Sequence, residues 1–185
     1  MQTSIVISGF GGQGTLFAGM VVAYAGLSQG RHVTWMPSYG PEMRGGTANA
    51  TVIVSDEEVG SPVVYRPDAV IALNHPSVDK YVPRMRSGGV LVYNASIVAE
   101  EILRSDVTVM AVPAGDIASE LGDIRTANMV ALGALMARLD ILPLEPLVVA
   151  LREHLLADRP ELLEINEQAL YRGAGLAQSL NRAAA

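Results

Sequence analysis

Cysteine is absent from the 185 residues, and charged and aromatic residues are scarce, at 17% and 5% of the chain. Without cysteine the chain cannot form a disulfide, a zinc finger or a cysteine-ligated iron–sulfur cluster. The formal charge is −6 and no basic run occurs, which argues against nucleic acid as a partner. No apolar run is long enough to span a bilayer, and the start of the chain lacks the basic region of a signal peptide. We therefore expect a cytoplasmic protein without a membrane partner.

Apolar residues, in contrast, make up 50% of the chain. The length fits one domain, and we take residues 1–185 as that domain. Two arrangements would cover so much apolar surface: a sheet buried on both faces, or a surface buried by other subunits. The same surplus favours association of the isolated chain, for example as a homodimer.

The strongest local signal is a glycine-rich turn near the start of the chain. Residues 3–8 form a short β-branched run typical of a buried strand. A G-x-G-x-x-G spacing with one extra glycine follows, and its members are Gly9, Gly11, Gly12 and Gly14. Residues 13–29 then have helical length, with apolar side chains three or four residues apart at Leu16, Met20, Ala23 and Leu27. Such a turn places backbone N–H groups and the positive end of a helix where an anion can bind.

The ligand of this turn is left open by the sequence. A dinucleotide site also needs an acidic residue about 20 positions later, at the end of the second strand. The expected strand at 31–36 has none, and the nearest acid, Glu42, lies in the loop that follows. The turn could bind NAD(P) or flavin, serve only strand–helix packing, or hold the phosphate or carboxylate of another ligand or partner.

The rest of the chain alternates strand and helix patterns. After a Pro- and Gly-rich loop at 37–46, we expect strands at 47–55 (with one solvated face), 61–67 (an edge strand), 68–74, 90–94 and 107–112. We expect helices at 76–84, 97–104, 113–121, 126–139 (with Thr126 as N-cap), 144–156 and 161–177. This order predicts a single α/β domain of the doubly wound, Rossmann-like kind: a mostly parallel sheet, helices on both faces and a helical C-terminal end.

Ligands of such sheets bind beyond the carboxyl ends of the strands, which should gather residues 9–14, 38–46 and 74–76. Arg44 could clamp an anion or pair with Glu42, and Tyr39 could stack on a ligand or cap the core. Of the three histidines only His75 follows a strand end, and we predict neither a catalytic residue nor a metal site. The predicted binding residues are Gly9, Gly11, Gly12, Gln13, Gly14, Ser38, Tyr39, Arg44, Gly45 and Gly46.

Three motifs carry a family resemblance. They are Gly9-Phe-Gly-Gly-Gln-Gly14, Pro37-Ser-Tyr-Gly-Pro-Glu-Met-Arg-Gly-Gly46 and Thr126-Ala-Asn-Met-Val-Ala-Leu-Gly-Ala134. In this order they resemble the gamma subunit of the 2-oxoacid:ferredoxin oxidoreductases, the pyruvate/ketoisovalerate oxidoreductase gamma domain family. The second motif is similar to the form found in the 2-oxoglutarate and branched-chain 2-oxoacid enzymes.

The resemblance implies a role in a complex that converts a 2-oxoacid to an acyl-CoA and CO2 and reduces ferredoxin. Such complexes use thiamine diphosphate with Mg between alpha and beta subunits, and [4Fe-4S] clusters that a chain without cysteine must leave to a ferredoxin-like subunit. This chain would be a non-catalytic lid on the coenzyme A side, inactive alone and typical of anaerobic metabolism. The alternatives are a stand-alone NAD(P)- or flavin-binding oxidoreductase and a purely structural module.

Overall fold

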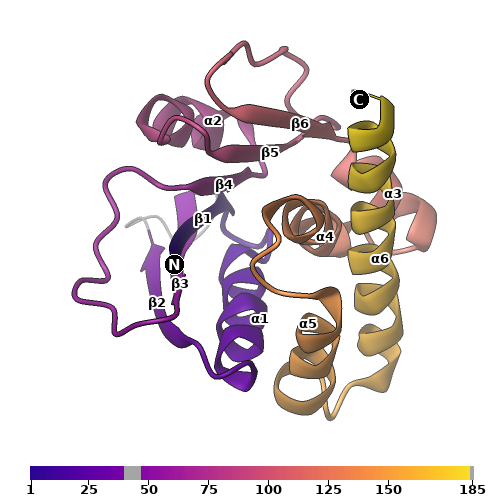
Figure 1. Ribbon diagram of the computed structural model, residues 1–185. Helices are drawn as coiled ribbons and strands as arrows, with labels where there is room; N and C mark the ends of the chain where they lie inside the picture. The colour runs from indigo at the N-terminus through magenta and orange to yellow at the C-terminus, as the bar shows by residue number, and fades with distance from the viewer. Residues whose placement is uncertain (40–46, 184–185) are drawn as a thin grey trace.

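A computed structural model describes residues 1–39 and 47–183, and its centre is a six-stranded sheet (Figure 1). The strands are β1 (Gln2–Phe10), β2 (His32–Tyr39), β3 (Thr47–Ser55), β4 (Ala69–Ala72), β5 (Val90–Asn94) and β6 (Thr108–Val112). Their order across the sheet is β2-β3-β1-β4-β5-β6. β1, β4, β5 and β6 are parallel, whereas β3 runs antiparallel to both of its neighbours. The predicted mostly parallel α/β fold is confirmed, and the reversed strand is an addition to it.

Helices cover both faces of the sheet, as predicted. They are α1 (Thr15–Ser28), α2 (His75–Tyr81), α3 (Ala114–Leu121), α4 (Ala127–Leu139), α5 (Leu144–Ala150) and α6 (Pro160–Ala183), with short turns η1 (Val82–Arg84), η2 (Ile124–Thr126) and η3 (Leu151–Leu155, a π-helix). Figure 1 shows α2 on one face and α1, α4, α5 and α6 on the other. Among the described helices, none combines the length and apolarity needed to cross a bilayer.

Alternating side chains of the strands divide the core into two clusters. Ile5, Ile7 and Ile71 pack with α1 and α4, whereas Val6, Val70 and Leu91 pack with α2 and η1. Burial on both faces accounts for much of the apolar surplus in the sequence.

The prediction of a solvated face on the strand at 47–55 was wrong. β3 lies between β1 and β2, so Val52 is paired with Ile5 on one side and Trp35 on the other. Almost the whole strand is buried, including Thr51 and Asn49. The alternation of polar and apolar residues therefore marks two buried environments.

Three further predictions differ from the structure: the end of one strand, the presence of another strand and the presence of one helix. β2 continues through Pro37 to Tyr39, because an edge strand tolerates a residue without an N–H group. Residues 61–67 form no strand, and residues 97–104 form no helix. In the second segment Val98 packs against the α2 side of the sheet and Arg104 donates to the carbonyl of Val82, so tertiary contacts outweigh helix propensity.

α1 approaches the sheet through its smallest residues. A Cβ atom on Gly19 would lie 2.7 Å from Ala50 Cβ and 2.9 Å from Trp35 Nε1. A Cβ atom on Gly26 would lie 2.7 Å from a methyl group of Val33. Glycine at these two positions thus permits close helix–sheet packing.

Candidate functional site

The glycine turn joins β1 to α1 at the carboxyl edge of the sheet. Gly12 and Gly14 have φ angles of +97° and +70°, which side chains rarely adopt, and Gly14 precedes the first residue of α1. Gln13 N donates to Phe10 O at 3.1 Å and closes the turn. Within the described residues, the N–H groups of Gly11, Gly12 and Gly14 have no hydrogen-bond partner.

The side chain of Gln13 folds back and ties the turn to β4. Its Oε1 accepts from Phe10 N at 2.6 Å and from Asn74 Nδ2 at 3.1 Å. Its Nε2 donates to Leu73 O at 3.3 Å. A Cβ atom on Gly9 would lie 2.7 Å from Oε1, so Gly9 is needed to make room for this amide.

Three buried asparagines hold the helices that begin at the same edge. Asn74 caps α2 by accepting from Ser77 N at 3.0 Å. Asn94 Oδ1 accepts from the N–H groups of Ser96 and Gly115, each at 3.2 Å, which joins the end of β5 to the start of α3. Asn128, near the start of α4, donates to Gly14 O at 2.9 Å. The edge is therefore organised before any ligand binds.

A cavity of about 330 Å³ opens between these elements. Its lining residues are Gly12, Gln13, Leu73, Asn94, Ser96, Ile97, Gly115, Asp116, Ser119, Ile124, Arg125 and Ala127. Asn94 is only 2% exposed, and in the described part of the chain its Nδ2 has no hydrogen-bond partner. The cavity thus combines an apolar wall with an amide donor.

The charges at the cavity mouth are already partly balanced. Arg125 forms a two-pronged contact with Asp123, with Nη2–Oδ2 at 2.6 Å and Nε–Oδ1 at 2.9 Å. This guanidinium lowers the pKa of Asp123. Because Arg125 is mostly exposed, it can turn to a ligand anion. Asp116 also lines the cavity and would disfavour a negative group placed beside it.

His75 lies outside the cavity lining. Its Nε2 is 2.9 Å from a Glu100 carboxylate oxygen, and its Nδ1 is 3.2 Å from Asp79 Oδ2. Hydrogen bonds to Glu100 and then Asp79 raise the pKa of His75. The two carboxylates contact opposite sides of the ring, and the described residues contain no group of three or more ligands arranged around a metal. His75 links α2 to the loop that follows β5.

The predicted binding residues fall into three groups. The first five, Gly9, Gly11, Gly12, Gln13 and Gly14, form the turn, and Gly12 and Gln13 line the cavity. Ser38 and Tyr39 end β2 on the far side of β3, and Ser38 is exposed. Arg44, Gly45 and Gly46 lie outside the described residues. The structure therefore brings the turn together with Leu73 and Asn74, separately from the end of β2.

Sequence reasoning missed most of the cavity. Asn94, Ser96 and Arg125 were not predicted. One signal was available, because Asn94 ends a buried strand and Asn74 lies two residues after another. No such sequence signal pointed to Arg125, because the short turn that positions it has no regular sequence pattern.

Strand order also bears on dinucleotide binding. In a dinucleotide site the strand that carries the ribose-binding acid lies next to the first strand. Here β3 lies between β1 and β2. Two strand spacings of about 4.8 Å therefore separate the end of β2 from the glycine turn. This geometry disfavours the usual ribose contact, in agreement with the missing acid.

Comparisons with known proteins match most of the chain to one family. The family model described as pyruvate ferredoxin/flavodoxin oxidoreductase matches residues 4–176. A ketoisovalerate oxidoreductase subunit VorA from Methanothermobacter thermautotrophicus is 44% identical over 136 residues, which cover 74% of this chain and 28% of that protein. A 2-oxoglutarate synthase subunit KorC from Methanothermobacter marburgensis is 37% identical over 142 residues, covering 73% of this chain and 76% of that one.

Two solved structures have the same fold. The gamma subunit of a keto/oxoacid ferredoxin oxidoreductase from Geobacter sulfurreducens has a TM-score of 0.82 at 30% identity, over 96% of this chain and 99% of that one. A 2-oxoglutarate:ferredoxin oxidoreductase from Magnetococcus marinus, solved with 2-oxoglutarate, coenzyme A and succinyl-CoA, has a TM-score of 0.87 at 26% identity, over 96% of this chain and 31% of that one. The chain thus corresponds to less than a third of the VorA and Magnetococcus chains.

Proposed function

The chain belongs to the pyruvate ferredoxin/flavodoxin oxidoreductase family, and from this premise we propose that it is the gamma subunit of a multi-subunit 2-oxoacid:ferredoxin oxidoreductase. In the proposed reaction a 2-oxoacid loses CO2, its acyl group forms a thioester with coenzyme A, and two electrons reduce ferredoxin. The substrate would be 2-oxoglutarate or 2-oxoisovalerate, the acids of the KorC and VorA enzymes. The chain would act in the cytoplasm with alpha, beta and cluster-bearing subunits.

Within that complex the chain would act as a lid on the coenzyme A side. Thiamine diphosphate, bound by other subunits, supplies the decarboxylation chemistry. The observation that carries our assignment is the cavity at the carboxyl edge, with its apolar wall and the amide of Asn94. That lining suits an uncharged part of coenzyme A, either the adenine or a pantetheine amide, whose acceptor atom would take a hydrogen bond from Asn94 Nδ2.

The phosphates of coenzyme A would lie at the glycine turn. Gly11 and Gly12 are exposed there, at the positive end of the 14-residue helix α1. The remaining predicted residues, Ser38, Tyr39, Arg44, Gly45 and Gly46, would contact the same ligand or the alpha–beta pair. Arg44→Ala would then raise the KM for coenzyme A, and a purely structural module would leave it unchanged.

The alternative function, a stand-alone NAD(P)- or flavin-binding oxidoreductase, is less well supported. Residues 36–38 offer neither an acid nor an arginine, and β3 separates them from the turn. The relatives described above are all named as subunits or enzymes of 2-oxoacid oxidation.

Asn94→Asp tests the proposal in the assembled enzyme. The variant keeps the oxygen that accepts from Ser96 and Gly115 but replaces the amide donor. We expect the KM for coenzyme A to rise about tenfold, the loss of one hydrogen bond, with the KM for the 2-oxoacid unchanged. Asn166→Asp is the matched control, because it removes an amide donor in α6 far from the cavity. Equal coenzyme A kinetics in all three enzymes would refute the assignment.

A further inference from the structure

Helix α1 has apolar side chains on its outer side as well as on the side that packs into the core. Its fully buried residues are Thr15, Ala18, Gly19, Val21, Val22, Ala25 and Gly26. The side chains at the other helical spacing are only partly buried or are exposed, and these are Leu16, Met20, Ala23 and Leu27. Leu27 is 56% exposed, and none of the 14 residues of α1 carries a charge. A surface helix normally shows the reverse pattern, with polar residues outward.

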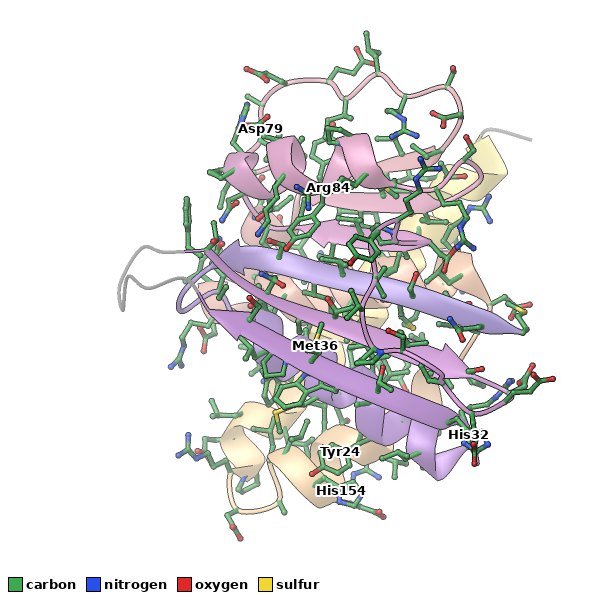
Figure 2. The ribbon with its side chains drawn as sticks, turned by 90° about the vertical axis from the view of Figure 1, so that its left-hand side faces the viewer. Tyr24, His32, Met36, Asp79, Arg84 and His154 are labelled. Carbon is green, nitrogen blue, oxygen red and sulfur yellow. The ribbon has the colours of Figure 1, made fainter. Side chains whose placement is uncertain are left out.

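The edge of the sheet extends this apolar surface. Trp35 of the edge strand β2 lies against Gly19 and is still 37% exposed. At the other border Tyr24 stacks on His154, with ring centroids 4.6 Å apart. Figure 2 shows Tyr24 and His154 together below the edge strand that carries Met36. We name Leu16, Met20, Ala23, Leu27 and Trp35 the outer α1 stripe, of which Ala23 also contacts the core.

We propose that the outer α1 stripe seats an α-helix of another subunit of the oxidoreductase complex. Steps of four, three and four residues from Leu16 to Leu27 are the a/d spacing by which two helices pack along a common seam. The partner helix should therefore carry large apolar side chains at the same spacing and no charge along the seam. This inference rests on the proposed function, because it requires a complex.

A second copy of this chain fits the stripe less well. A contact three helical turns long covers only part of the roughly 800 Å² per partner that a standard stable interface buries. A larger partner can add further contacts around the stripe. In the VorA and Magnetococcus chains, moreover, the matching region is joined to a polypeptide more than twice its length. Those relatives thus combine this region with a larger polypeptide in one chain.

The test is assembly of the complex with a Met20→Glu/Leu27→Glu variant. Leu27 is exposed and Met20 is only partly buried, and neither is among the fully buried residues of α1, so we expect the thermal unfolding of the isolated chain to change little. Co-expressed with its alpha, beta and cluster-bearing subunits, the variant should bind them at least 100-fold more weakly than the original chain. Leu180→Glu is the control, because it places the same charge on an exposed leucine of α6. It should assemble normally.

Photo-crosslinking identifies the occupant directly. A benzoylphenylalanine at position 27 should crosslink to an apolar helical peptide of a partner subunit, and one at position 180 should not. Assembly of the double variant at full strength, or a crosslink between two α1 helices, would overturn the inference. Failure of the unmodified chain to assemble with these subunits would instead refute the proposed function, so the two failures are distinguishable.

Discussion

The start of helix α1 and its outer side differ in how many of their contacts come from the chain itself. At the start of α1, Gln13 accepts from Phe10 N and Asn128 donates to Gly14 O, which fixes the glycine turn. Along the outer side of α1, Met20 is partly buried and Leu27 is exposed. The chain itself thus fixes the shape of the turn and leaves the N–H groups of Gly11, Gly12 and Gly14 for a ligand, whereas we propose that the outer α1 stripe packs against another subunit. Changes at the turn should therefore be measurable in the isolated chain, and changes at the stripe only in the assembled enzyme.

The largest effect on the isolated chain should come from Gly14→Ala. The new Cβ would overlap Asn128 Nδ2, and the residue would keep a φ of +70°. We expect the free energy of unfolding in urea to fall by about 3 kcal/mol, the sum of backbone strain and overlap.

Two other glycines separate these causes. Gly12→Ala also adds a Cβ atom at a positive φ, +97°, but no atom lies within 4 Å of it. This variant should lower the free energy of unfolding by about 1 kcal/mol. Gly175→Ala has open space in an exposed part of α6 and should stabilise by up to about 1 kcal/mol. Equal losses at positions 12 and 14 would mean that Asn128 moves aside.

Gln13→Ala should have the next largest effect and lower the free energy of unfolding by about 2 kcal/mol. It leaves Phe10 N and Leu73 O without their partners inside the turn. Gln13→Glu keeps the acceptor but cannot donate to Leu73, so its loss should be smaller. Gln168→Ala, which removes an exposed amide contact on α6, should stay within about 0.5 kcal/mol of the original chain. If both alanine variants unfolded alike, the turn would not depend on Gln13.

The two sides of α1 can be compared by truncating one residue on each. Val22→Ala removes two methyl groups from a fully buried site and should cost about 1.5 kcal/mol. Leu27→Ala removes more apolar volume, yet should cost less than about 0.5 kcal/mol, because the side chain is exposed. Urea unfolding of both isolated variants measures the difference. A larger loss at position 27 would show that the stripe is already covered within the chain.

Local sequence patterns predicted the elements better than their arrangement. The glycine turn, the strand at 90–94 and the helices from residue 113 onward were found because glycine punctuation and apolar runs encode them locally. The position of β3 between β1 and β2 was not predicted, because strand order depends on pairing partners that are distant in sequence. The spacing of Leu16 and Met20 likewise predicted a helix without revealing that this side faces outward, because small residues can form the core side.

The candidate site shows the same limit. Gln13 was predicted as part of a ligand-binding turn, and its contacts with Leu73 and Asn74 lie about sixty positions away in the chain. Asn94 and Arg125 reach one cavity from separate elements, so no short motif contains both. Whether the predicted residues bind coenzyme A stays a prediction for the kinetic tests above.

The smallest expected effect is a pH dependence at His75, which belongs to neither the turn nor the outer α1 stripe. Glu100 and Asp79, the two carboxylates facing the ring, raise its pKa above 6.5. Because the folded-state pKa is the higher one, the stabilisation is present below pH 6.5 and is lost as the pH rises through the folded value. After correction for the intrinsic rise of amide exchange with pH, the protection of residues 97–104 should therefore be lower at high pH than near pH 6, and His75→Gln should remove this difference in protection. His32→Gln, on the opposite edge of the sheet, should preserve it. An NMR titration midpoint for His75 at or below 6.5 would show that the two contacts do not persist in solution.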